Sequence, residues 1–446
     1  MDLRTHVARV VAPLSIALLG ACADDAAKTD TSNTSDATEA TESETTEADV
    51  EDTSPDSVEP EVADTTDAAA DTLEVDAQDT AETTDTPDTA DTADTTDTSD
   101  AEVVANGTLS LIEVGTPVAL TSDGDLALLQ DFASPEVDVY LYNVLSGVLE
   151  KKTTLGSPLE NFATGLSDGG RITALYSSPI VAGAWTLESG WEVIPSPFET
   201  GCDNSRGGAW DVSAEGDVVV GFFWDGCTTE AFRWTDASGE GVVTPLQRIG
   251  DSLSETLAPV NRATVVSGDG RIAAGFAENL VIDRSAAIWR EDGTGFFLAP
   301  DEVETPSEVL AINYDGSIVA GAWGYSGFMW SEATGFVDTG IPPEGLPSDR
   351  TYINAIAADG DLLFGTSGDN FFGVMQAIVW TKDGGARLLA NVCAEQGVVI
   401  PEGYVLNGVL AASRDGSIVL GTALDLDSPF GAQVSFVLEL PASAYF

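Results

Sequence analysis

A short turn flanked by apolar runs recurs seven times after residue 106, and this repetition constrains the fold more than any other feature. The turns are Asp123-Gly124, Asp168-Gly169, Glu215-Gly216, Asp269-Gly270, Asp315-Gly316, Asp359-Gly360 and Asp415-Gly416. Their glycines lie 44 to 56 residues apart, which is close to the period of β-propeller blades. The segments between them are short, rich in Val, Ile, Phe and Trp, and interrupted by Gly. This composition favours strands, so we do not expect helical repeats.

Each repeat is predicted to form four strands. The acidic-Gly pair makes a tight turn after the first strand, because Gly adopts positive φ at little cost. The second strand is a nearly continuous apolar run, such as Asp217–Phe222 or Ser317–Ala322, typical of a strand buried on both faces. The third strand carries a large residue: Tyr142, Trp185, Trp234, Trp289, Trp330, Trp380 or Leu438. Fourth strands are predicted at Gly190–Pro195, Val242–Leu246, Gly295–Pro300 and Ala386–Val392.

The two ends of the repeat region complement each other. The chain ends after Gln433–Leu440 without a fourth strand, while Thr108–Val114 is an extra strand before the first repeat. Pairing this extra strand with the last blade leaves no unpaired blade edge. We therefore predict an all-β fold over residues 106–446, a seven-bladed β-propeller of four-stranded blades closed by residues 108–114, and expect a monomer.

The first 21 residues have the pattern of an export signal. Arg4 and Arg9 precede an apolar run that is too short to span a bilayer, and Leu19-Gly20-Ala21-Cys22 follows. This stretch resembles the lipobox of bacterial lipoproteins, which implies cleavage before Cys22 and acylation of that residue. The alternative is an ordinary secretory signal with an incidental Cys. Ala23 after the Cys favours the outer membrane over the inner one, and the side of that membrane stays open.

Residues 22–105 are predicted to be a disordered tether. Thr, Asp, Ala, Glu and Ser dominate and no aromatic residue occurs, so this segment buries too little surface to offset its chain entropy. A glycosylated stalk is the alternative, because Ser- and Thr-rich tracts with Pro accept O-linked glycans.

Charge and histidine content exclude several classes of function. The chain has 75 acidic and 17 basic residues, a net charge of −58, so nucleic acid would be repelled. Its one histidine, His6, lies in the predicted signal. A Ser-His-Asp triad or a His-ligated metal is therefore excluded from the predicted mature chain. We expect no cofactor, no metal and no catalytic residue, and name none.

The acidic-Gly turns also invite interpretation as calcium loops. Calcium needs six to eight oxygen ligands, and two acids beside a Gly supply too few, so a structural hairpin is preferred.

The opposite face of the ring collects the more variable loops and holds a candidate binding face: Trp224, Asp225, Trp323, Tyr325, Asp369, Phe371, Asp425 and Asp427. Acids beside aromatics suit a glycan or a cation, and the alternative is ordinary solvated and packing residues.

Three cysteines follow Cys22. Cys202 and Cys227 are predicted on the same face of the third blade, and because the chain is expected to be exported we predict a disulfide between them. Cys393 is then unpaired, and with no histidine to activate its thiol we expect it to be buried.

The repeats also resemble a known family. The segments Ala411–Gly421 and Glu230–Thr235, and the closing stretch from Leu388 to Pro441, are similar to the HAF repeats of bacterial extracellular proteins. The resemblance covers most of residues 117–441 and implies an extracytoplasmic β-propeller without implying an activity. The first two repeats depart from the pattern, because Leu128 and Ala174 stand where the second strand should have Gly.

Three functions remain open from the sequence. The first is a non-catalytic binding or scaffolding propeller, held on a membrane through its lipid, with a protein or glycan partner. The second is an enzyme acting on glycans or phosphoesters through acidic residues of the loop face. The third is a structural subunit of an envelope assembly.

Overall fold

The computed structural model describes residues 106–132, 135–177, 180–197, 206–224, 229–236, 241–250, 260–278, 284–299, 305–346, 349–369, 375–428 and 431–446. The predictions for the signal segment, for Cys22 and for the tether therefore lie outside the described residues. So does the predicted disulfide, because neither Cys202 nor Cys227 is described.

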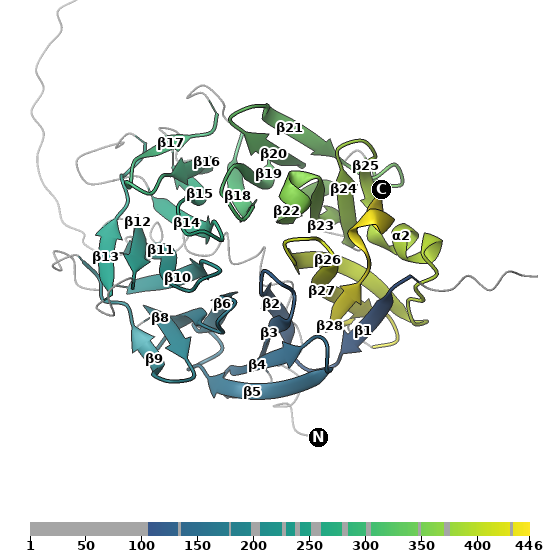
Figure 1. Cartoon of the computed structure of the whole chain (residues 1–446), viewed down its shortest axis with the longest axis horizontal. Coiled ribbons are helices and arrows are strands. Elements are labelled where there is room, and N and C mark those ends of the chain that lie inside the picture. Colours follow the sequence, from purple (N-terminus) through teal and green to yellow (C-terminus); the bar gives the residue numbers. More distant parts are fainter. Residues whose placement is uncertain are drawn as a thin grey trace, which may run out of the picture. The chain divides into compact units, whose positions relative to one another are not determined.

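The described chain forms seven four-stranded antiparallel sheets, arranged as the blades of a ring (Figure 1). The first six blades each use four consecutive strands, the first of which is innermost. In chain order the strands are β1 (Thr108–Ile112), β2 (Thr116–Leu120), β3 (Leu126–Asp131), β4 (Asp138–Asn143), β5 (Val148–Thr154), β6 (Phe162–Leu166), β7 (Ile172–Tyr176), β8 (Val181–Thr186), β9 (Gly190–Val193), β10 (Arg206–Val212), β11 (Val218–Trp224), β12 (Thr229–Thr235), β13 (Val242–Pro245), β14 (Asn261–Val266), β15 (Ala273–Glu278), β16 (Arg284–Trp289), β17 (Gly295–Phe297), β18 (Ser307–Ile312), β19 (Ile318–Trp323), β20 (Ser326–Ser331), β21 (Gly335–Gly340), β22 (Arg350–Ala357), β23 (Leu362–Gly368), β24 (Gln376–Thr381), β25 (Gly385–Leu388), β26 (Tyr404–Ala412), β27 (Ile418–Asp425) and β28 (Ala432–Glu439).

The ring closes as the sequence predicted. β1 pairs antiparallel with β28, so that Thr108 lies opposite Glu439 and Ile112 opposite Ser435. The last blade therefore has the order β1-β28-β27-β26, with three strands from the end of the chain and one from its start. The closing strand is two residues shorter than predicted, because it ends at Ile112.

The large residues of the third strands fill the spaces between blades. The seven hydrophobic clusters of the described chain each lie between two neighbouring blades. Trp289, for example, is fully buried among residues of β11, β12 and its own blade. Tyr142 and Leu438 occupy the same place in the clusters that flank the closing blade. This arrangement confirms the predicted packing of blade on blade.

Four of the acidic-Gly turns are held by the side chain of their own Asp, namely those at Asp123, Asp269, Asp315 and Asp415. In the fifth blade the Asp315 carboxylate accepts hydrogen bonds from the Ser317 hydroxyl (2.6 Å) and backbone N–H (2.9 Å), while Asn313 accepts one from Ile318 N–H (2.9 Å). The Ser317 hydroxyl is the main cause of a lowered pKa of Asp315. These carboxylates are thus committed to the turn.

Three sequence predictions are wrong, and the first is the position of the second turn. In the second blade Gly170, and not Gly169, has the positive φ of 80°. Ser167 N–H donates there to Arg171 C=O four residues on, whereas Ser213 in the next blade reaches five residues on to Val218. The second turn is therefore one residue shorter, and Asp168 takes the place that Ala214 has in the third blade.

The second error is the predicted strand Ala386–Val392. β25 ends at Leu388, and α2 (Leu389–Glu395) follows. Its buried residues are Leu389, Val392 and Cys393. The last two lie three and four positions after the first, which places all three on one face of a helix. Cys393 is fully buried as predicted, and burial raises the pKa of its thiol to about 11.

Candidate functional site

Every innermost strand carries a β-bulge at the same place. In β10, for example, the pairing with β11 shifts between Ala209 and Asp211, which leaves Trp210 as the extra residue. Bulges re-aim the side chain of the inserted residue. The seven inserted residues all line one cavity of about 340 Å³ in the centre of the ring, and they are Val118, Thr164, Trp210, Thr264, Leu310, Asn354 and Leu410.

At one end the cavity is bordered by the turns that follow the innermost strands. We call the residue before the acidic position of each turn, or its equivalent in the second blade, the rim residue. The rim residues are Ser122, Asp168, Ala214, Gly268, Tyr314, Ala358 and Arg414. Apart from Ala358, each of them lines the cavity.

Backbone hydrogen bonds join most of the rim from blade to blade. Donor and acceptor are Asp168 N–H and Ala214 C=O (2.9 Å), Ala214 N–H and Gly268 C=O (3.0 Å), Asp269 N–H and Tyr314 C=O (3.0 Å), Ala358 N–H and Arg414 C=O (2.8 Å), and Arg414 N–H and Ser122 C=O (2.7 Å). Side chains make one further link, because Ser122 donates its N–H (2.6 Å) and hydroxyl (2.5 Å) to the Asp168 carboxylate. The rim is thus a fixed frame around the cavity.

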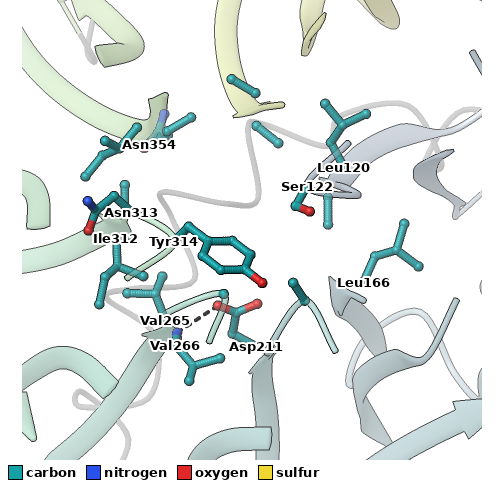
Figure 2. Close-up of a pocket in the computed structure, with 18 of the residues that line it drawn as sticks. Leu120, Ser122, Leu166, Asp211, Val265, Val266, Ile312, Asn313, Tyr314 and Asn354 are labelled. Carbon is teal, nitrogen blue, oxygen red and sulfur yellow. Dashed lines mark hydrogen bonds between the residues drawn. The ribbon is translucent and has the colours of Figure 1, made fainter. Parts of the chain in front are cut away.

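Tyr314 lies over the cavity within this frame. Its ring packs against Gly268, where a Cβ would come within 2.3 Å of Cδ2 of the ring. The Arg414 guanidinium lies 4.0 Å from the ring centroid, at the distance of a cation–π contact. Figure 2 shows the ring reaching across the space between the Ser122 and Ile312 sides.

Asp211 is the acidic residue of the cavity wall below the rim. Its carboxylate points into the cavity (Figure 2) and accepts hydrogen bonds from Val212 N–H (2.8 Å) and, in the next blade, Val266 N–H (2.9 Å). Burial raises its pKa to about 7, although both N–H groups act in the opposite direction. Within the described part of the chain, no Lys or Arg forms an ion pair with it.

A buried ion pair lies two residues before the bulges of the fourth and fifth blades. Arg262 and Glu308 are each 6% exposed, and their side chains approach to 2.5 Å. Arg284 reaches the other Glu308 oxygen at 3.4 Å, and the Thr264 hydroxyl donates to Glu308 at 3.1 Å. The Arg262 guanidinium also lies 4.3 Å from the centroid of the Trp210 ring. This cluster joins two blades beside the cavity.

The two tryptophans of the predicted binding face pack within their own blades. Trp224 lies 5.8 Å from the Arg206 guanidinium of its own blade. The Trp323 ring packs edge-on against two rings of its blade, those of Phe328 and Phe336.

The other described residues of the predicted face do not gather in one place, because Tyr325 lies in the fifth blade, Asp369 in the sixth, and Asp425 and Asp427 in the seventh. Tyr325 is 64% exposed and contacts Arg350 of the sixth blade. Asp425 caps a turn by accepting Asp427 N–H at 3.0 Å. Asp369 follows β23, and Asp225 and Phe371 lie outside the described residues.

Sequence reasoning missed Asp211, Tyr314 and Arg414. A signal was present, because the place two residues before the Ser, Thr, Asn or Ala that opens each turn is otherwise small or apolar. Its seven occupants are Ala119, Gly165, Asp211, Val265, Ala311, Ala355 and Ala411. A single acid in this series marks a difference that the fold does not require.

The described part of the chain contains no group of three or more His, Cys, Asp or Glu placed to hold a metal ion. It also contains no helix long and apolar enough to cross a bilayer.

The fold and this cavity define a seven-bladed β-propeller. No protein-family model and no curated protein matches the chain. Among solved structures it is similar to oligogalacturonate lyase from Vibrio parahaemolyticus, with 14% identity over 75% of this chain and 92% of that one, at a TM-score of 0.47. It is also similar to virginiamycin B lyase from Staphylococcus aureus, with 13% identity over 74% of this chain and 99% of that one, at a TM-score of 0.46.

TolB from Acinetobacter baumannii has 18% identity over 50% of this chain and 52% of its own length, at a TM-score of 0.36. This chain therefore spans about half of TolB. No substrate or partner is transferred from any of these proteins, because sites on one fold serve unrelated functions.

Proposed function

We propose that this chain is a non-catalytic binding propeller of the bacterial cell envelope, with its ligand site in the central cavity. The observation that carries the proposal is the asymmetry of that cavity. The repeats agree at turn glycines and at the large residues between blades, where the fold needs agreement. They differ at the bulges and the rim, where a bound molecule would be touched.

The chemistry of the cavity supports binding rather than turnover. Its wall mixes aliphatic side chains with polar ones, and several of the polar groups already bond within the protein, as Thr164 does to Ala209 C=O and Asn354 to Val409 C=O. The chain has no histidine after His6, so no residue of the propeller can act as a histidine acid or base. Four of the turn carboxylates, those of Asp123, Asp269, Asp315 and Asp415, are held by local hydrogen bonds.

The binding part is tested with a variant that fills the cavity. Ala411 lines it and is partly exposed, so Ala411→Leu adds volume there. We expect at least one compound from a fractionated envelope extract to raise the Tm of the wild-type protein and to be recovered unchanged. At 100 times its Kd such a ligand stabilises by about 2.7 kcal/mol.

The same compound is expected to leave the Tm of Ala411→Leu unaltered. A shift of equal size in the variant would place the ligand elsewhere, and conversion of the compound would make the protein an enzyme. Ala333→Leu, the same substitution at an exposed position in the turn between β20 and β21, serves as the matched control and should respond like the wild type.

The place in the cell is part of the proposal. The lipobox-like Leu19–Cys22, the acidic tether to residue 105 and the resemblance to HAF repeats together support an exported lipoprotein. Acyl chains on Cys22 would hold it on a membrane, with the outer membrane favoured by Ala23. A chain of net charge −58 would be repelled by anionic lipid, so the lipid rather than the propeller is the anchor.

Substitution of Cys22 tests the anchor. In bacterial cells, the wild-type protein is expected to incorporate an alkyne-tagged fatty acid and to sediment with membranes. Cys22→Ser should lose the label and leave the membrane fraction, while Cys393→Ser keeps both. Label on Cys22→Ser, or none on the wild type, would contradict the anchor and leave the binding proposal standing.

A further inference from the structure

We infer that the central cavity binds a small organic cation, an ammonium group carried on an apolar body, with the ammonium on Asp211. This inference rests on the proposed binding function and names its ligand class. It depends on three features of the described residues: the charge of the cavity, the composition of its wall and the state of Asp211.

Charge is the first feature. The residues that line the cavity include three carboxylates, Asp168, Asp211 and Asp359, and one cation, Arg414. Arg414 lies over the Tyr314 ring, and Asp168 accepts two hydrogen bonds from Ser122. Asp211 has only two backbone N–H groups as described partners. A cation is therefore attracted to this cavity, and an anion is repelled.

The wall selects the body of the ligand. Beside its polar groups, the cavity is lined by aliphatic side chains of five blades, those of Leu120, Leu166, Val265, Val266, Ile312 and Ile356 (Figure 2 labels the first five). Burying apolar surface here is favourable by roughly 25 cal/mol per Å². A sugar would bring many hydroxyl groups to a wall whose polar side chains already have partners: Thr164 donates to Ala209 C=O, Thr264 to Glu308 and Asn354 to Val409 C=O. An amine with an aromatic or alkyl body meets both the carboxylate and the wall.

The state of Asp211 gives the proposal a signature in pH. The strands on either side present no titratable group at the cavity, because β6 offers Thr164 and Leu166, and β14 offers Thr264, Val265 and Val266. The other titratable groups that line it are Asp168, Tyr314, Asp359 and Arg414.

The sign of the pH effect follows from burial, which raises the pKa of Asp211 to about 7. The free protein therefore holds a proton on Asp211 below that pH, and a bound ammonium has to displace it. Affinity for a cation should fall as the pH drops through 7, and binding near pH 7 should release a proton. A neutral ligand has no reason to show either effect.

Benzylamine, with benzyl alcohol and benzoate as neutral and anionic counterparts, tests the inference on the full-length protein. Calorimetry at pH 8 should show benzylamine binding at least about tenfold more tightly than benzyl alcohol, and benzoate not at all. Between pH 8 and pH 6 the benzylamine affinity should fall about tenfold, the change in the ionised fraction of an acid with a pKa of about 7. Titration in two buffers of different ionisation enthalpy should reveal proton release.

Two variants separate the site from the fold. Asp211→Asn should remove the preference for benzylamine over benzyl alcohol, and Ala411→Leu should weaken both while leaving Asp211 in place. If Asp211→Asn does not fold, the pH series on the wild type decides alone.

Absence of benzylamine binding, equal binding of benzylamine and benzyl alcohol, or an affinity unaffected by pH would overturn the inference. A compound from the envelope screen that stabilises the wild type but not Ala411→Leu would still uphold the binding function in that case. The two proposals therefore fail separately.

Discussion

Glu308→Ala is expected to lower the free energy of unfolding by about 3–5 kcal/mol, the usual cost of removing one member of a buried ion pair. Glu308 is 6% exposed and lies between Arg262 and Arg284. Without it, Arg262 keeps its charge in the same buried place, next to the Trp210 and Phe276 rings. The cation–π contacts that remain are each worth about 2 kcal/mol or more at a desolvated site, but they are present before the substitution as well, so they do not replace the lost carboxylate.

The design of the experiment separates burial from charge. Glu308→Gln keeps the shape and one acceptor, so we expect a smaller loss. The double variant Arg262→Met with Glu308→Leu removes both charges together and should recover most of the stability, because apolar replacements of buried pairs are often neutral.

Glu332→Ala is the matched control for this pair. It breaks the ion pair with Arg290, in which the two side chains are 51% and 76% exposed, and it should cost under about 1 kcal/mol. Urea unfolding followed by tryptophan fluorescence measures all four variants. Equal losses for Glu308→Ala and Glu332→Ala would show that the buried pair contributes no more than a surface pair.

The cluster also bears on the ligand cavity. Thr264 and Leu310, which are bulge residues of the cavity wall, each lie two positions after the paired residues Arg262 and Glu308. The ion pair therefore fixes the fourth blade against the fifth at the level of the cavity. We expect Glu308→Gln to weaken ligand binding only through the loss of this fixed geometry.

Repetition made the ring predictable from sequence. The period, the buried second strands and the surplus strand at Thr108 each report a contact that recurs in every blade or closes the set. The errors also follow from the repetition. The period predicts the second turn at Asp168-Gly169, but that loop is one residue shorter than the others. It also predicts a fourth strand through Val392, whereas residues 389–392 begin a helix.

The cavity was not predicted, because its determinants do not occur in a recognisable motif. A bulge arises from how two strands pair. The inserted residues, such as Trp210 and Asn354, are of unrelated types, so the residue type does not predict the bulge. The candidate binding face was predicted from the variable loops. These loops do not include Asp211 or Tyr314, which lie on an innermost strand and in a short turn. The informative variation lies among the seven copies of the innermost strand and its turn, and not in the long loops that join the strands.

Gly365→Ala is expected to cost about 3 kcal/mol or more, at the upper end of what overpacking does. A Cβ on Gly365 would lie 1.9 Å from the Tyr352 carbonyl oxygen, and that oxygen belongs to backbone that cannot rotate away. The neighbouring pairing of β22 with β23 shifts at the bulge between Ile353 and Ala355.

The same close approach explains why Gly recurs at this place in five blades. At Gly221, Gly275, Gly321 and Gly421, a Cβ would lie 2.0 to 2.2 Å from a carbonyl oxygen of the innermost strand. In the first two blades the register places Leu129 opposite Pro117 and Ala174 opposite Ala163. The residue that replaces Gly in the first blade is therefore Leu129. The prediction of Leu128 is wrong by one position.

Gly169→Ala is the control for Gly365→Ala. Gly169 has no positive φ, and the nearest atom to an added Cβ is the Ser167 hydroxyl oxygen at 4.0 Å. This variant should be neutral or more stable by about 0.4–1 kcal/mol, because Ala reduces the freedom of the unfolded chain. Thermal and urea unfolding of both variants measure the difference. If Gly365→Ala were as stable as Gly169→Ala, strand β22 would be able to move away from β23, and the bulges would not hold the cavity wall in one geometry.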